Sequence, residues 1–280
     1  MRFLAWIACA AAGIVIAAVS TAAAEPAATA WITGHNSKVR LLADGSVAAR
    51  DGDVFYAGIE IQLQPGWKTY WRMPGDAGVP PNFDWSTSEN VASVAVLYPA
   101  PLRMPDQGGE AIGYKGAVMF PVRIQPKDRA LPVRLNVALE YGVCRDICIP
   151  TEARLELVLA PGRPATEPDP AIAAALRKVP RALANRLATD PAVLAISGGL
   201  ASAAPQIRIE VREAIDVFIE APDGLFLPQP VRVDGKGQNG AAVYLVDLTK
   251  APDAKDMLGK PLRITAIGTA GAIETTWILK

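Results

Sequence analysis

Two cysteines, Cys144 and Cys148, are the residues of this chain whose type and spacing most clearly allow chemistry. Three residues separate them, and segments with alternating apolar and polar residues flank them on both sides. Residues four positions apart in an extended chain lie about 13 Å from one another, whereas a disulfide requires Cα atoms within about 7 Å. Segment 143–149 is therefore predicted to turn, as a hairpin tip or a helical turn, with Gly142 and Pro150 bounding it.

A disulfide that closes so short a loop is a poor brace for a chain of 280 residues. On the chain-entropy estimate, a loop of about five residues contributes roughly 2 kcal/mol, against about 5 kcal/mol for a loop of about a hundred. As a redox pair the spacing is favourable, because the second thiol can resolve a mixed disulfide formed by the first. Arg145 would favour a thiolate and Asp146 would oppose it. The residues alone therefore support a structural bond and a redox switch equally.

Other chemistries lack the residues they need. Structural zinc normally takes about four protein ligands. The chain has three cysteines, Cys9, Cys144 and Cys148, and one histidine, His35, which is far from the cysteine pair in sequence. A Cys–His dyad with His35 has no supporting motif, and we expect this histidine at the surface. The chain has 28 Lys and Arg residues and 28 Asp and Glu residues, so it has no net positive charge that would attract nucleic acid or anionic lipid. The sequence thus indicates no metal site, no hydrolase and no bound cofactor.

The first 24 residues have the pattern of a secretory signal peptide. Arg2 supplies a positive start, residues 3–19 are apolar, and residues 22–24 give a small-residue cleavage site before Glu25. Cys9 lies in the apolar run and is expected to leave with it. An uncleaved anchor is the alternative, but no later stretch approaches the roughly 20 apolar residues of a spanning helix. We therefore expect a periplasmic protein that does not span the membrane after cleavage, in a compartment where disulfides persist.

The segments that must position the cysteines alternate with period two, as half-buried strands do. Residues 133–141 and 151–159 flank the pair directly, and Gly and Pro clusters separate many such short runs. This organisation favours an antiparallel sandwich. The run at 118–124 contains Pro121, which predicts an edge strand. Further strands are predicted at residues 59–64, 207–212, 217–220, 231–234, 242–248, 262–267 and 273–279.

The chain after the signal peptide is predicted to hold two β domains, which its length allows. Residues 161–170 contain four prolines and indicate a linker, and the Ala- and Arg-rich run 171–187 indicates a helix that Pro180 kinks or divides. The expected division is a signal peptide at 1–24, a β-sandwich with the cysteines at 25–162, a Pro-rich and helical linker at 163–190, and a smaller β-sandwich-like domain at 191–280. The second domain has no cysteine or histidine, so its expected role is docking or spacing.

Three ordered motifs resemble the N-terminal periplasmic (alpha) domain of the DsbD thiol:disulfide interchange proteins, and more closely that of their ScsB-like relatives. They are the aromatic strand end PGWKTYW at 65–71, the motif IGYKG at 112–116 and the cysteine motif YGVCRDICIP at 141–150. The resemblance covers about residues 30–160, and the short spacer between the cysteines is similar to that of the ScsB-like branch. It implies an immunoglobulin-like antiparallel β-sandwich that passes electrons from a membrane reductase to periplasmic thiol proteins.

The resemblance also implies roles for individual residues. Cys144 and Cys148 would be the redox pair, joined as a disulfide in the oxidised state, with Cys148 as the attacking thiol. Tyr114 would be a cap that shields the sulfurs, and Gly113 and Gly116 would give its loop freedom. These five residues form the core of the implied site.

Four residues of the aromatic motif carry weaker implications. Tyr70 would line the cysteine pocket, with plain core packing as the equally supported alternative. Lys68 occupies a position where the family often has an aromatic residue, so its role stays open. Trp67 and Trp71 are expected to pack in the core.

The implied activity is that of a thiol–disulfide oxidoreductase of the protein-disulfide reductase type, working without a cofactor. A separate membrane thiol reductase would donate the electrons, and periplasmic thioredoxin-like or disulfide-bearing proteins would accept them. The alternative is a noncatalytic periplasmic binding module whose disulfide merely holds a hairpin.

Overall fold

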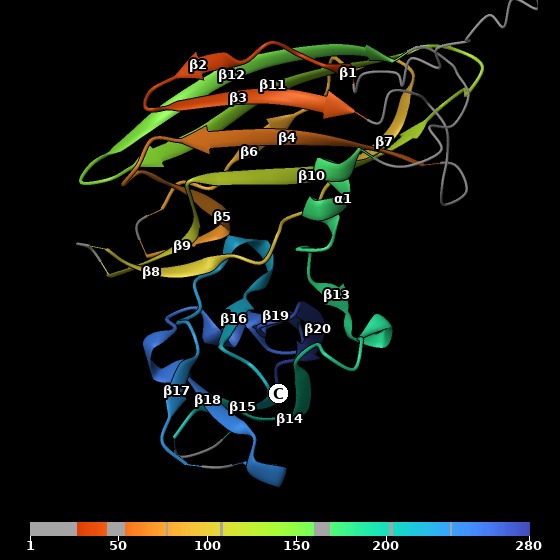
Figure 1. Ribbon diagram of the computed structural model, residues 1–280. Helices are drawn as coiled ribbons and strands as arrows, with labels where there is room; N and C mark the ends of the chain where they lie inside the picture. The colour runs from red at the N-terminus through yellow and green to blue at the C-terminus, as the bar shows by residue number, and fades with distance from the viewer. Residues whose placement is uncertain are drawn as a thin grey trace, which may run out of the picture.

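The computed structural model describes residues 27–43, 54–76, 78–106, 109–159, 169–201, 204–235 and 237–280. The expected signal peptide with Cys9, and the proline-rich stretch 161–168 of the expected linker, lie outside the described residues. In the ranges above, no helix combines the length and the apolar character that a membrane span requires. Strands dominate these ranges and form four sheets (Figure 1). The expected all-β fold is therefore confirmed.

Two antiparallel sheets form the first sandwich. The strands of one sheet are β1 (Ala27–Ala28), β2 (Ile32–Gly34), β3 (Ser37–Ala43), β4 (Phe55–Leu63), β7 (Val91–Val96) and β10 (Ala117–Pro126). The strands of the other are β5 (Lys68–Gly75), β6 (Asn82–Asp84), β8 (Leu102–Asp106), β9 (Gly109–Lys115), β11 (Val133–Cys144) and β12 (Cys148–Leu159). The spatial order is β1-β3-β4-β10-β7, with β2 beside β3, in the first sheet and β12-β11-β5-β9-β8, with β6 beside β11, in the second.

The core of this sandwich lies between the two sheets and follows from the alternation in the sequence. Ile59 and Ile61 of β4 and Leu135 of β11 are fully buried members of one cluster. Pro121, however, lies in β10, which pairs with both β4 and β7, so the predicted edge placement is wrong. Its missing N–H faces the end of β7, where the carbonyl oxygen of Pro121 still accepts a backbone hydrogen bond from Leu97.

The rest of the chain forms a second sandwich of two four-stranded sheets within the described residues. One has the order β13-β20-β19-β16, with β13 (Arg181–Ala182), β20 (Ala272–Ile278), β19 (Pro261–Ile267) and β16 (Asp216–Glu220). The other has the order β14-β15-β18-β17, with β14 (Ala192–Gly199), β15 (Gln206–Arg212), β18 (Ala242–Asp247) and β17 (Val231–Val233). The strands expected from the sequence in this region are all present, and β13 and β14 are additional.

The helices are short. The predicted helix at 171–187 is wrong in length, because α1 spans only Pro170–Leu176 and Pro180 then leads into β13. Asp169 caps α1, its side chain accepting hydrogen bonds from the backbone N–H groups of Ala171 and Ile172. The single-turn 3₁₀ helices are η1 (Leu183–Asn185), η2 (Pro222–Gly224), η3 (Gln238–Gly240), η4 (Leu248–Lys250) and η5 (Ala254–Met257).

The two sandwiches lie one below the other, with β5, β8 and β9 of the first nearest to β16 and β19 of the second (Figure 1). Their cores meet, because Phe218 of β16 belongs to the same buried cluster as Trp71 of β5. The proposed domain limits at 25–162, 163–190 and 191–280 stay a prediction.

Candidate redox site

The two cysteines face each other at the tip of the β11–β12 hairpin. The strands pair continuously from Val133 opposite Leu159 to Cys144 opposite Cys148. The turn expected from the spacing is thus a hairpin tip, made by residues 145–147. It brings the two Cα atoms to 4.2 Å, and the sulfurs form a disulfide.

The two halves of the disulfide differ in exposure. Cys144 is 2% exposed and belongs to a small buried cluster with Tyr70, Met104 and Ala111. Cys148 is an exposed residue, and its neighbour Ile147 is 68% exposed. A protein thiol that approaches from solvent therefore meets Cys148 first.

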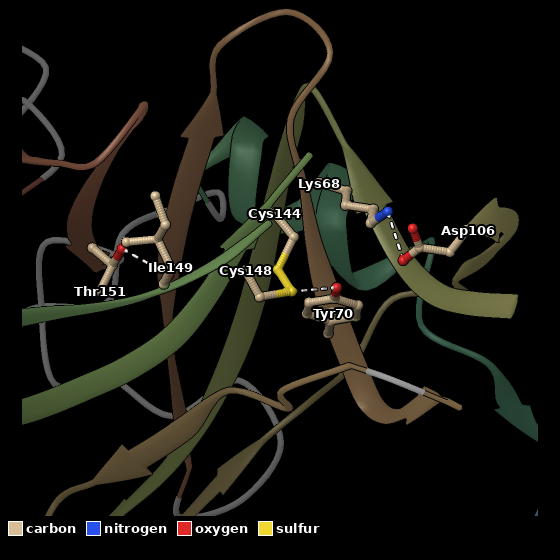
Figure 2. Close-up of a disulfide and its surroundings, with 7 residues drawn as sticks. All are labelled: Lys68, Tyr70, Asp106, Cys144, Cys148, Ile149 and Thr151. Atoms are coloured by element: carbon tan, nitrogen blue, oxygen red, sulfur yellow. Dashed lines mark hydrogen bonds and ion pairs between the residues drawn. A yellow bond between two sulfur atoms is a disulfide. The ribbon is translucent and has the colours of Figure 1, made fainter. Parts of the chain in front are cut away.

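Tyr70 of β5 is in direct contact with the disulfide. Its hydroxyl oxygen lies 3.0 Å from Sγ of Cys148, in hydrogen-bond contact (Figure 2). Its ring packs tightly on two glycines, since an added Cβ would lie 2.5 Å from a ring carbon at Gly78 and 3.3 Å from one at Gly142. The ring is fully buried. This packing holds the hydroxyl against the sulfur.

A buried ion pair lies beside Tyr70. Lys68 pairs in register with Cys144, is 7% exposed, and places Nζ 2.8 Å from a carboxylate oxygen of Asp106 (Figure 2). Burial, reinforced by the negative charge of Asp106, raises the pKa of Tyr70 to about 12. Tyr70 therefore keeps its proton at neutral pH and can donate a hydrogen bond to sulfur. No feature of the sequence pointed to Asp106, which lies at the end of the short strand β8, far from both cysteines in sequence.

The raised pKa of Tyr70 predicts a loss of stability at high pH. Below about pH 10 this residue is neutral in both the folded and the unfolded chain, so it adds no pH dependence. As the pH rises from about 10 towards about 12, the unfolded chain loses the proton first, so the free energy of unfolding falls. Urea unfolding across this range should show a shallower fall for Tyr70→Phe than for the native chain. Equal pH slopes for both proteins would contradict the prediction.

Tyr114 lies in the core of the first sandwich. Its hydroxyl donates to the carbonyl oxygen of Pro99 at 2.8 Å, and its ring meets Phe120 edge-on at 5.4 Å between centroids. Residues 112–115 belong to strand β9, so the predicted cap loop is wrong. Gly113 permits this strand to pair closely with β5, because an added Cβ would lie 2.0 Å from the carbonyl oxygen of Thr69. The cap role of Tyr114 is a prediction that these core contacts do not support.

Gly116 lies in the turn between strands β9 and β10. It takes a φ of 72° between β9 and β10, a conformation that favours glycine. An added Cβ would meet open space there. Gly116 therefore shapes the β9–β10 turn, and a role in a mobile cap stays a prediction.

The surface beside the hairpin tip combines aromatic and charged side chains. The guanidinium of Arg145 lies 5.3 Å from the ring centre of Trp67, and the exposed His35 meets that ring edge-on at 5.1 Å. Arg145 also pairs with Asp146 at 2.9 Å. Trp71 is fully buried, as expected. In the described ranges, no group of three or more His, Cys, Asp or Glu side chains is placed to hold a metal.

A hairpin disulfide with one buried and one exposed cysteine, set in an antiparallel sandwich, fits a thiol:disulfide interchange module. Residues 38–160 match the family described as "Thiol:disulfide interchange protein DsbD, N-terminal". The resemblance seen in the sequence is therefore confirmed over this part of the chain.

The structure is also similar to the crystal structure of the N-terminal periplasmic domain of ScsB from Proteus mirabilis. The sequence identity is 25%, the TM-score is 0.67, and the match covers 91% of this chain and 99% of the other. The likeness thus extends past residue 160 into the second sandwich. It agrees with the immunoglobulin-like fold that the resemblance implied. No curated protein sequence matches the chain significantly.

Proposed function

We propose that this protein is a periplasmic thiol–disulfide oxidoreductase that relays electrons through Cys144 and Cys148. The donor is a separate membrane thiol reductase, and the acceptors are thioredoxin-like or disulfide-bearing periplasmic proteins. The observation that carries the proposal is the exposed residue Cys148, whose sulfur is bonded to a buried Cys144 and lies 3.0 Å from the Tyr70 hydroxyl. The proposal includes export by a signal peptide at 1–24, which is removed.

The first half-reaction reduces the disulfide. A thiolate of the donor attacks Sγ of Cys148, the Cys144–Cys148 bond breaks, and its electron pair stays on Cys144, which takes up a proton. The second thiol of the donor loses its proton and attacks the donor sulfur of this mixed disulfide, releasing Cys148. Cys148 takes up that proton, so two electrons and two protons have moved in all, and the donor has become a disulfide.

The second half-reaction returns the pair to its starting state. The Cys148 thiolate attacks a disulfide of the acceptor and expels one acceptor sulfur, which is protonated. Cys144 loses its proton and attacks Sγ of Cys148, which reforms the intramolecular disulfide and frees the second acceptor sulfur. The acceptor leaves as a dithiol. The four-residue spacing serves this last step, because the resolving thiol is already within bonding distance.

The surroundings support Cys148 as the attacking thiol. Tyr70 keeps its proton, and a hydrogen bond from its hydroxyl stabilises a thiolate more than a thiol. Lys68 adds a positive charge beside Cys144 that Asp106 balances. Tyr70 is thus a candidate catalytic residue, and Lys68 and Asp106 set the electrostatics behind it.

A redox titration tests this function. We expect the protein, equilibrated with mixtures of reduced and oxidised dithiothreitol or glutathione, to show a midpoint potential above about −300 mV for the Cys144–Cys148 couple. A relay must exchange with other thiol proteins in both directions, so its potential has to lie near theirs. Thiol alkylation followed by mass measurement reads the fraction reduced. A midpoint well below about −300 mV would mark a structural bond and refute the proposal.

A further inference from the structure

Strand β5 connects the redox site to the second sandwich within four consecutive residues. Tyr70 touches the disulfide, and the next three residues all contact the second sandwich. The ring centre of Trp71 lies 5.8 Å from that of Phe218, and Sδ of Met73 accepts a hydrogen bond from the Gln229 amide at 3.7 Å. The contacts of Arg72 between them are charged.

A break in the sheet register lies at these residues. Tyr70 still pairs with Gly113 of β9, but the next pair joins Gly75 to Ala111. Four residues of β5 therefore stand opposite one residue of β9. Such bulges redirect side chains and are frequent beside active sites. Here the bulge begins at the residue that follows Tyr70.

Arg72 fixes the bulge to two strands of the second sandwich. Its guanidinium donates to both carboxylate oxygens of Glu220, at 2.8 and 2.7 Å, and to Glu274. It also stacks on the Trp71 ring, with Cζ 4.5 Å from the ring centre. Burial lowers the pKa of Arg72, but the hydrogen bonds and charges of the two carboxylates outweigh burial and raise that pKa above its usual value. The side chain is thus held in one position from several directions.

A second bridge holds the strand that carries Asp106. Arg103 of β8 donates to both carboxylate oxygens of Asp216, each at 3.0 Å, and to the carbonyl oxygen of Val217 at 3.0 Å. Its guanidinium also lies over Phe218, 4.9 Å from the ring centre. The two strands that supply Tyr70 and Asp106 are therefore both tied to β16.

We propose that the second sandwich positions the redox site, with Arg72 as the positioning residue that holds Tyr70 in hydrogen-bond contact with Cys148. This inference rests on the proposed thiol–disulfide exchange and assigns the second sandwich a part in it. The contact allows little movement, since a hydrogen bond weakens once the donor and acceptor separate by a few tenths of an ångström. If β5 were released from Glu220 and Glu274, Tyr70 would no longer be held at this distance from Cys148.

The test measures how fast a single thiol attacks a small aromatic disulfide. A Cys9→Ser/Cys144→Ser chain keeps Cys148 as its one thiol. In this background we expect Arg72→Gln to lower the rate at neutral pH about tenfold and to move the pH profile upward, as loss of one hydrogen bond to a thiolate would. Tyr70→Phe should have the same effect, and adding Arg72→Gln to it should lower the rate no further. Arg72→Lys should restore part of the rate.

Two further variants keep the result interpretable. Arg40→Gln removes a comparable ion pair, Arg40 to Glu60 at 2.7 Å, from the other sheet and should leave the rate unchanged. If Arg72→Gln does not fold, Glu220→Gln replaces it, because the contact of Arg72 with Glu274 remains. The inference would be overturned if a folded Arg72→Gln variant kept the native rate. It would also be overturned if Arg72→Gln lowered the rate as much in the Tyr70→Phe background as it does alone. Failure of the unaltered Cys148 thiol to exchange would instead refute the proposed function.

Discussion

Replacing Cys148 with serine is expected to abolish exchange with protein disulfides, whereas replacing Cys144 should stop the reaction halfway. The exposed Cys148 is the sulfur that a partner can reach, and Cys144 lies beneath it at 2% exposure. Removal of the attacking group should lower the rate by at least about a thousandfold, as removal of a nucleophile does in other enzymes. Without Cys144, the attack still proceeds but the mixed disulfide is not resolved.

The two variants differ visibly on a non-reducing gel. Both carry Cys9→Ser, are reduced, and are mixed with an excess of a disulfide-bearing thioredoxin-fold protein as the probe. The Cys144→Ser chain should form a covalent one-to-one complex that dithiothreitol cleaves by reduction. The Cys148→Ser chain should form no such complex. A complex through Cys144 alone would reverse the assigned roles. No complex with either variant would favour a noncatalytic binding module with a structural disulfide.

The sequence predicted the parts of this site that depend on neighbouring residues. Strands 133–141 and 151–159 alternate cleanly because each faces a core on one side and solvent on the other. The short spacer between the cysteines then required a turn, and a hairpin between two such strands is the simplest one. The turn at the cysteine pair and the all-β class therefore followed from local pattern, whereas the choice between a hairpin tip and a helical turn stayed open.

Contacts that depend on the order of strands in the sheet were not visible in the sequence. Lys68 meets Asp106 only because β5 lies between β11 and β9, with β8 at the edge. The place of Tyr70 beside the cysteines was implied by the family resemblance and not by the residues alone. Nothing in the run at 102–106 marks a partner 38 positions earlier in the chain. The same holds for the second sandwich, where Glu220 belongs to an ordinary short strand.

The strand found at residues 112–115, where a loop was expected, has a physical reason as well. Residues 112–116 contain two glycines, which in sequence favour a loop. In the structure Gly113 serves close strand pairing, because its missing side chain lets β9 approach Thr69 and Tyr70. A glycine needed for close approach and a glycine needed for a turn look alike until the neighbouring strand is known.

Replacing Phe218 with alanine is expected to cost about 3–5 kcal/mol in the free energy of unfolding. This ring is fully buried where the cores of the two sandwiches meet, against Trp71 on one side and the Arg103 guanidinium on another. Its removal leaves a cavity that neither sandwich can fill alone. It also loosens Arg103 and, through Trp71, the β5 bulge.

Urea unfolding measures this loss, and Phe226→Ala is the matched control, since that ring belongs to the same sandwich but is 47% exposed. The control should change the free energy of unfolding by less than about 0.5 kcal/mol. If the packed junction couples the two sandwiches, the native chain should unfold in one transition and Phe218→Ala in two. Equal, small effects of both substitutions would mean that the junction contributes little to stability, and a weak junction could not hold Tyr70 against Cys148.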